Sequence, residues 1–105
     1  MPYLTRFILS SASLATLFSM PAFAHEGHES LTARSLAANC ASCHGTNGNA
    51  KAGMPRLAGL GKDYFVEQMQ NFKSGKRQAT LMHQIAKGFD DQQIAQLAEY
   101  FAAQK

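Results

Sequence analysis

The chain has 105 residues and a net charge of +3, with only two cysteines and no tryptophan. This length allows one domain, since domains usually hold roughly 100–200 residues. The charge is too small to indicate a dedicated nucleic-acid-binding protein. Two cysteines can build neither a disulfide-rich scaffold nor a four-cysteine zinc site. The role of these two cysteines is therefore the main clue to what this small chain does.

The first 24 residues have the three-part pattern of a secretory signal peptide. A short polar start that contains Arg6 precedes the apolar run 7–19, and Pro21 leads into an Ala-x-Ala end at Ala24. This pattern predicts export and cleavage after Ala24. The apolar run is shorter than the roughly 20 residues that a membrane span needs. We therefore expect the cleaved chain to be periplasmic and to have no membrane span.

A polar tail and one helical domain should follow the cleavage site. We expect a flexible tail over 25–29 and a single domain over 30–105. Ser30 can cap the first helix of this domain, which should run to about Asn39 because apolar residues recur there at helical spacing. The two cysteines come directly after this helix.

A long loop is predicted over 45–61, because this segment contains five glycines and Pro55. Loops of this length in a compact domain are usually functional or disordered. Three apolar residues, Met54, Leu57 and Leu60, lie inside this loop. Their presence indicates that the loop wraps around something apolar.

Three further helices are predicted after the loop. Asp63 can cap a helix over 64–73, whose apolar residues share one face. A short helix should occupy 80–87, and Asp90 and Gln93 have the spacing of a capping box at the start of a last helix. No segment alternates with period two, so the sequence predicts an all-α fold with about four helices.

Residues 40–44 read Cys-Ala-Ser-Cys-His, which is the C-x-x-C-H attachment sequence of c-type haem. Two thiols three positions apart lie on one helical turn and can add across the two vinyl groups of a haem. His44 then lies beneath the iron and can be its proximal ligand. A haem also supplies an apolar core element, which so small an exported domain needs. The sequence therefore predicts one covalently bound haem c.

Other uses of the cysteines and histidines compete with this interpretation. A redox dithiol would make the chain a periplasmic dithiol oxidoreductase, although such a C-x-x-C usually accompanies a βαβ unit. A disulfide between Cys40 and Cys43 would close a very short loop and stabilise little. His25 and His28 could form a copper-binding module, because imidazole suits copper, but a solvated polar tail is the plainer interpretation.

A methionine opposite His44 would raise the reduction potential of the haem and suit it to electron transfer. Met69 belongs to the apolar face of a helix, and Met54 is too close to His44 in sequence to reach the other face of the haem. Met82, in a short helix between two longer ones, is the best candidate, and His83 is its rival. Adjacent helical residues point about 100° apart, so only one of the two can face the iron.

These features together resemble a small class I cytochrome c, over about residues 30–104, which is nearly all of the chain expected after cleavage. The resemblance is carried by N-C-A-S-C-H-G, M-P-R-L-A-G-L, Y-x-x-x-Q, F-K-S-G-K-R and L-M-H-Q-I-A-K-G-F-D-D-Q-Q-I. The run 72–94 narrows the resemblance to a smaller group of class I cytochromes. The set is similar to one half of the two-haem cytochrome c4 group, and closer still to the cytochrome subunit of flavocytochrome c sulfide dehydrogenase. This chain has no second C-x-x-C-H, so we expect it to carry only one haem.

The resemblance also implies the residues of the site. Cys40 and Cys43 would hold the haem, with His44 and Met82 as axial ligands. The carbonyl of Pro55 would accept a hydrogen bond from His44. Leu57 and Leu60 would line the haem, and Arg77 would lie near the propionates. From the residues alone, the loop proline could equally be only a stiffener.

The resulting hypothesis is periplasmic electron transfer through one haem c. The chain would be the haem subunit of a flavocytochrome c sulfide dehydrogenase and would accept electrons from a flavoprotein subunit, since it has no residues of its own for sulfide chemistry. The alternative is a free carrier to a terminal oxidase or peroxidase, which would dock through a small interface. That interface would be ringed by lysines such as Lys51, Lys62, Lys73 and Lys76.

Overall fold

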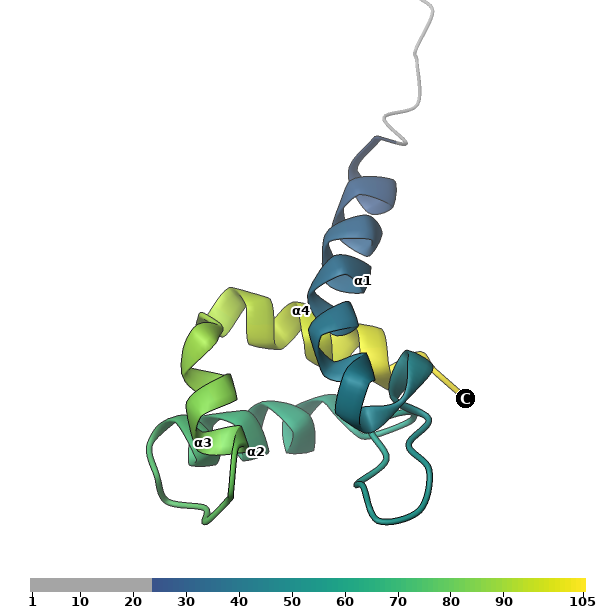
Figure 1. Ribbon diagram of the computed structural model, residues 1–105. Coiled ribbons are helices and arrows are strands. Elements are labelled where there is room, and N and C mark those ends of the chain that lie inside the picture. Colours follow the sequence, from purple (N-terminus) through teal and green to yellow (C-terminus); the bar gives the residue numbers. More distant parts are fainter. Residues whose placement is uncertain (1–23) are drawn as a thin grey trace, which may run out of the picture.

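The computed structural model describes residues 24–105, which form helices and connecting loops (Figure 1). The expected signal peptide lies outside these residues except for Ala24. The elements in chain order are α1 (Ala24–His44), the 3-10 turn η1 (Thr46–Gly48), α2 (Lys62–Lys73), α3 (Met82–Ile85), the 3-10 turn η2 (Ala86–Gly88) and α4 (Asp91–Ala102). Residues 24–105 contain no strand, so the expected all-α fold with four helices is confirmed.

α1 begins at Ala24 rather than after Ser30, and it continues through both cysteines to His44. Residues 25–29, expected as a flexible tail, form its first turns instead. That stretch holds one glycine and no proline, so little in it opposes a helix. The helix ends at His44, and the next residue, Gly45, has a φ of 80° and a ψ of 160°, a backbone conformation that essentially only glycine adopts. The C-x-x-C-H motif therefore occupies the end of α1.

The core forms where α4 packs against both α1 and α2 (Figure 1). Ala37 of α1 is buried, and its small side chain lets the two helices approach closely. The fully buried side chains Ile94, Leu97 and Phe101 come from α4, and the Phe101 ring lies 5.6 Å from that of Phe65 in α2. This three-helix core is the platform on which the loop and α3 are placed.

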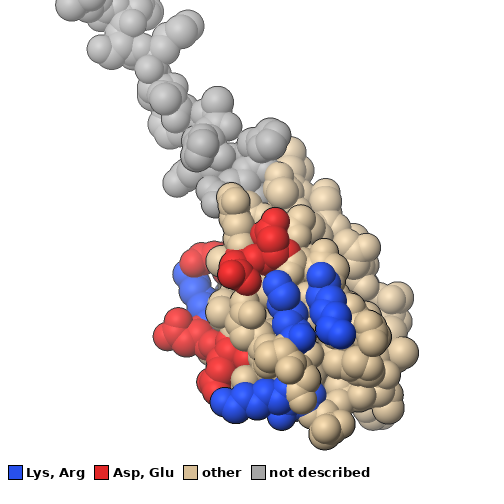
Figure 2. Space-filling view, turned by 90° about the vertical axis from the view of Figure 1, so that its left-hand side faces the viewer, with Lys and Arg blue, Asp and Glu red and all other residues tan. Residues whose placement is uncertain are grey.

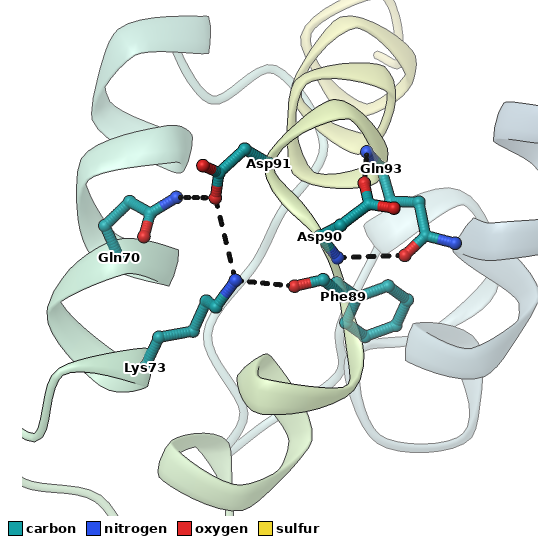
Figure 3. Close-up of polar contacts among 6 residues, drawn as sticks. All are labelled: Gln70, Lys73, Phe89, Asp90, Asp91 and Gln93. Carbon is teal, nitrogen blue, oxygen red and sulfur yellow. Dashed lines mark hydrogen bonds and ion pairs between the residues drawn. The ribbon is translucent and has the colours of Figure 1, made fainter.

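The helix starts differ in how well the sequence predicts them. α4 begins with the predicted capping box, in which the Asp90 carboxylate accepts from the Gln93 N–H at 2.8 Å and the Gln93 side chain accepts from the Asp90 N–H at 3.0 Å (Figure 3). α2, in contrast, begins at Lys62 with Gly61 as its cap residue, so Asp63 lies in the first turn rather than at the cap. A carboxylate there still interacts favourably with the helix dipole.

The long glycine-rich loop is tied to the core by backbone hydrogen bonds. The N–H groups of Leu57 and Ala58 both donate to the carbonyl of Gly48, at 2.9 and 3.1 Å. The N–H of Gly59 donates to the carbonyl of Phe101 near the end of α4, at 2.9 Å. These bonds hold the loop beside the end of α1, where the motif lies. Among the described residues, no helix is both long and apolar enough to cross a membrane.

Candidate functional site

The two cysteines lie on the last turns of α1, and neither forms a disulfide. Cys40 is half-buried against the hydrophobic core, whereas Cys43 is exposed. Burial raises the pKa of the Cys40 thiol above its ordinary value. A redox dithiol needs the opposite shift, because the thiolate is the reactive form. The environment of Cys40 therefore favours attachment of an apolar group over dithiol chemistry.

His44 is held in a fixed orientation directly after the second cysteine. Its side chain is buried, with 8% of its surface exposed, and its Nδ1 lies 2.7 Å from the carbonyl oxygen of Pro55. A carbonyl can only accept a hydrogen bond, so Nδ1 must be the donor. In the neutral ring this leaves the lone pair of Nε2 free for a metal ion. A hydrogen bond of this kind is how proteins usually orient a ligating histidine.

The two leucines of the loop form an apolar wall. Leu57 and Leu60 are half-buried and pack against the same core cluster as Cys40. The two thiols, the oriented imidazole and this wall are the groups that a covalently held haem requires. The described residues therefore fit a haem c at the end of α1.

The methionines are in clearly different environments. Met69 is a core residue with 5% of its surface exposed, and Met54 lies in the loop with 44% exposed. Met82 is half-buried at the start of α3 and packs against the core cluster. His83, beside it, has a buried Nδ1 without a hydrogen-bond partner among the described residues. Met82 thus has the packing expected of an inward-facing ligand, and His83 remains its rival.

Arg77 follows α2 in the chain, and its side chain packs back against that helix. Its guanidinium stacks over the Phe72 ring at 4.8 Å from the centroid, and its Nη1 donates to the side-chain oxygen of Gln68 at 2.5 Å. Its backbone N–H also donates to the carbonyl of Asn71 at 3.0 Å. These contacts attach Arg77 to α2.

One set of contacts involves residues that no sequence motif connects. Gln70 and Lys73 of α2 reach Asp91 of α4, and Lys73 also reaches the backbone before α4. Each residue looks like an ordinary polar position on a helix surface. The only signal in the sequence is that they flank the segment 74–90, which contains Met82.

The copper hypothesis concerns residues at the start of α1. His25 and His28 are in its first turns, and their side chains lie outside the part of the structure that is described. Among the described side chains, no three His, Cys, Asp or Glu residues gather in a way that could hold a metal ion. A copper site on these two histidines therefore remains a prediction.

Residues 31–105 match the family defined as cytochrome c. The chain belongs to the cytochrome c family. Membership implies a covalently attached haem c and a role in electron transfer. It confirms the resemblance to a class I cytochrome c that the motifs indicated.

Several cytochromes resemble this one in sequence and structure. It is 37% identical over 94 residues to cytochrome c4 from Pseudomonas aeruginosa, covering 89% of this chain and 47% of that protein. It is 39% identical over 66 residues to the cytochrome subunit of sulfide dehydrogenase from Chlorobaculum tepidum, covering 63% of this chain and 60% of that protein.

A solved structure supports the same relationship. The cytochrome c4 of Acidithiobacillus ferrooxidans superimposes with a TM-score of 0.61 at 31% identity, over 73% of this chain and 48% of that one. This cytochrome c chain therefore spans about half the length of the cytochrome c4 relatives that it matches.

Proposed function

We propose that this chain transfers electrons in the periplasm through one haem c, as the haem subunit of a flavocytochrome c sulfide dehydrogenase. The observation that carries the haem assignment is the His44 imidazole, oriented by Pro55 beside two free thiols. When bound, the haem supplies a one-electron Fe(II)/Fe(III) couple. The 105 residues contain a single C-x-x-C-H, which supports one haem.

Different residues of the chain would hold different parts of the haem. Cys40 and Cys43 would attach it, and the free Nε2 of His44 and the thioether of Met82 would bind its iron. Leu57 and Leu60 keep water from the apolar side of the site. Arg77 is proposed to neutralise charge on the propionates, an interaction that would compete with its present contacts on α2. The signal pattern that ends at Ala24 supports delivery to the periplasm.

The flavoprotein partner is proposed from the similarity to a protein named the cytochrome subunit of sulfide dehydrogenase. The chain itself contributes only the electron-carrying group, and a flavin subunit would oxidise the sulfide. We expect the chain to co-purify from its native periplasm with a flavin-containing protein that reduces the haem when sulfide is added. Elution of the haem protein alone, from an extract that also contains such a flavoprotein, would count against the subunit role.

The lysines expected around the interface of a free carrier are only partly available. Lys62 pairs with Glu99 at 2.6 Å, and Lys73 is engaged with α4, whereas Lys51 and Lys76 are exposed. Figure 2 shows acidic and basic side chains interspersed on one face of the molecule, without a broad patch of one sign. Elution without a flavoprotein in the co-purification experiment would favour the free carrier.

Replacing Met82 by Ala should remove the weak near-infrared absorption band that marks a methionine bound to ferric haem iron. The reduction potential should fall as well, because a methionine ligand raises it. The matched variant His83→Ala should retain the band. A band that survives in Met82→Ala, or that appears only in His83→Ala, would assign the sixth ligand to another residue.

A further inference from the structure

A polar cluster joins the two ends of the segment that carries Met82. It is formed by Gln70, Lys73 and Asp91, and we call it the α2–α4 clamp. The Lys73 ammonium donates to the backbone carbonyl of Phe89 at 2.7 Å and lies 3.6 Å from Oδ1 of Asp91. The same Oδ1 accepts a hydrogen bond from the Gln70 side chain at 2.8 Å (Figure 3). The clamp therefore links the end of one helix to the start of another.

The chain topology gives this clamp its importance. Lys73 is the last residue of α2 and Asp91 is the first residue of α4, so the clamp joins the two ends of the intervening segment 74–90. α3, which carries Met82, lies within that segment and contacts α2 and η2. All four residues of α3 are described, and none of them is buried. Met82 is half-buried against the core cluster, so the anchoring of the segment's ends adds to the constraint that this partial packing places on it.

The contacts within the clamp are unequal. The Asp91 side chain is 84% exposed, and exposed ion pairs contribute little because water screens them. The Lys73 side chain is only 26% exposed, and its bond to the Phe89 carbonyl is a charge-assisted hydrogen bond in a partly shielded place. The hydrogen bond from Gln70, together with the nearby charge of Lys73, lowers the pKa of Asp91 below its ordinary value. Lys73 is thus the central residue of the clamp.

We propose that the α2–α4 clamp is a positioning device for the sixth ligand of the haem, and that Lys73 limits how readily the Met82 segment moves aside. This inference rests on the proposed function, because it takes Met82 as the ligand. A clamped segment keeps the methionine in place, whereas a loosened one lets an external ligand reach the iron. Lys73 is accordingly a positioning residue that acts through the backbone at Phe89.

Lys73→Met keeps the length of the side chain and removes its charge and its donors. We expect the ferric holoprotein of this variant to bind added imidazole about tenfold more tightly than the unmodified protein. The reason is that the Met82 segment would move aside more readily without the charge-assisted hydrogen bond of Lys73. The near-infrared methionine band should persist before imidazole is added. Gln70→Ala removes only one bond to Asp91 and should increase imidazole affinity by a smaller factor, so it tests the clamp independently of the behaviour of Lys73→Met.

The matched control is Lys62→Met, which breaks the Lys62–Glu99 ion pair at the other end of α2. Its imidazole affinity should equal that of the unmodified protein. Equal increases in Lys62→Met and Lys73→Met would show general loosening and overturn the clamp, as would no increase in Lys73→Met. Absence of the methionine band from the unmodified protein would overturn the ligand assignment and this inference with it, but would leave haem attachment and electron transfer standing.

Discussion

Replacing Cys40 and Cys43 together by Ala should abolish covalent haem attachment. The two thiols lie on the last turns of α1, on either side of Ala41 and Ser42, and each would supply one bond to the haem. The variant should also lose helical structure, because Leu57, Leu60 and Met82 are only half-buried by protein atoms. Haem staining of the exported protein after denaturing electrophoresis measures attachment, and far-ultraviolet circular dichroism measures the helical content.

Ser42→Ala is the matched control for the cysteine variant. It alters the residue between the thiols and removes only the weak contact of its hydroxyl with the Cys43 sulfur, at 3.9 Å. Its haem should remain attached. If acid-acetone instead extracted the haem from the unmodified protein, or if two free thiols could be titrated in it, covalent attachment would be wrong and the dithiol alternative would gain support.

Gly48→Ala should strongly destabilise the domain, because this position has both an unfavourable backbone conformation and no room. Gly48 has a φ of 76°, and a Cβ there would lie 2.8 Å from each of three atoms, in Leu57, Ala58 and Phe101. The left-handed conformation costs an alanine ~1–2 kcal/mol, and overpacking adds ~1–3 kcal/mol. We expect the free energy of unfolding of the holoprotein in urea to fall by about 3 kcal/mol.

Gly75→Ala separates the two causes. Gly75 has the same φ of 76°, but a Cβ there would meet nothing within 4 Å. Its substitution should therefore cost only the backbone contribution, ~1–2 kcal/mol. Equal losses in the two variants would show that the loop moves away from α4 and that the crowding at Gly48 has no energetic consequence.

Local patterns predicted local structure well. The capping box of Asp90 and Gln93 depends on residues three apart, and it is present as expected. The helix starts at Ala24 and Lys62 were placed less well, because a polar residue such as Ser30 or Asp63 fits a cap but is also tolerated inside a helix. The C-x-x-C-H motif is also local, so its chemistry could be inferred without a fold.

Contacts between distant residues were harder to predict. From the residues alone, the His44–Pro55 hydrogen bond was one of two equal interpretations of the proline, and only the family resemblance favoured it, since a glycine-rich loop can take many conformations between those residues. The α2–α4 clamp could not be predicted at all, because it depends on how the end of α2 meets the start of α4. Likewise, the stacking of Arg77 on Phe72 follows from the turn between them and not from either residue type.

The hydrogen bond between His44 and Pro55 has a further consequence for the speed of electron transfer. The imidazole is buried and is held through Nδ1 by the Pro55 carbonyl. A ring that is both buried and hydrogen-bonded has little freedom to reorient when the charge at a bound iron changes by one. We therefore expect the protein on this side of the haem to contribute little to the reorganisation energy, which would keep the nuclear barrier to electron exchange low.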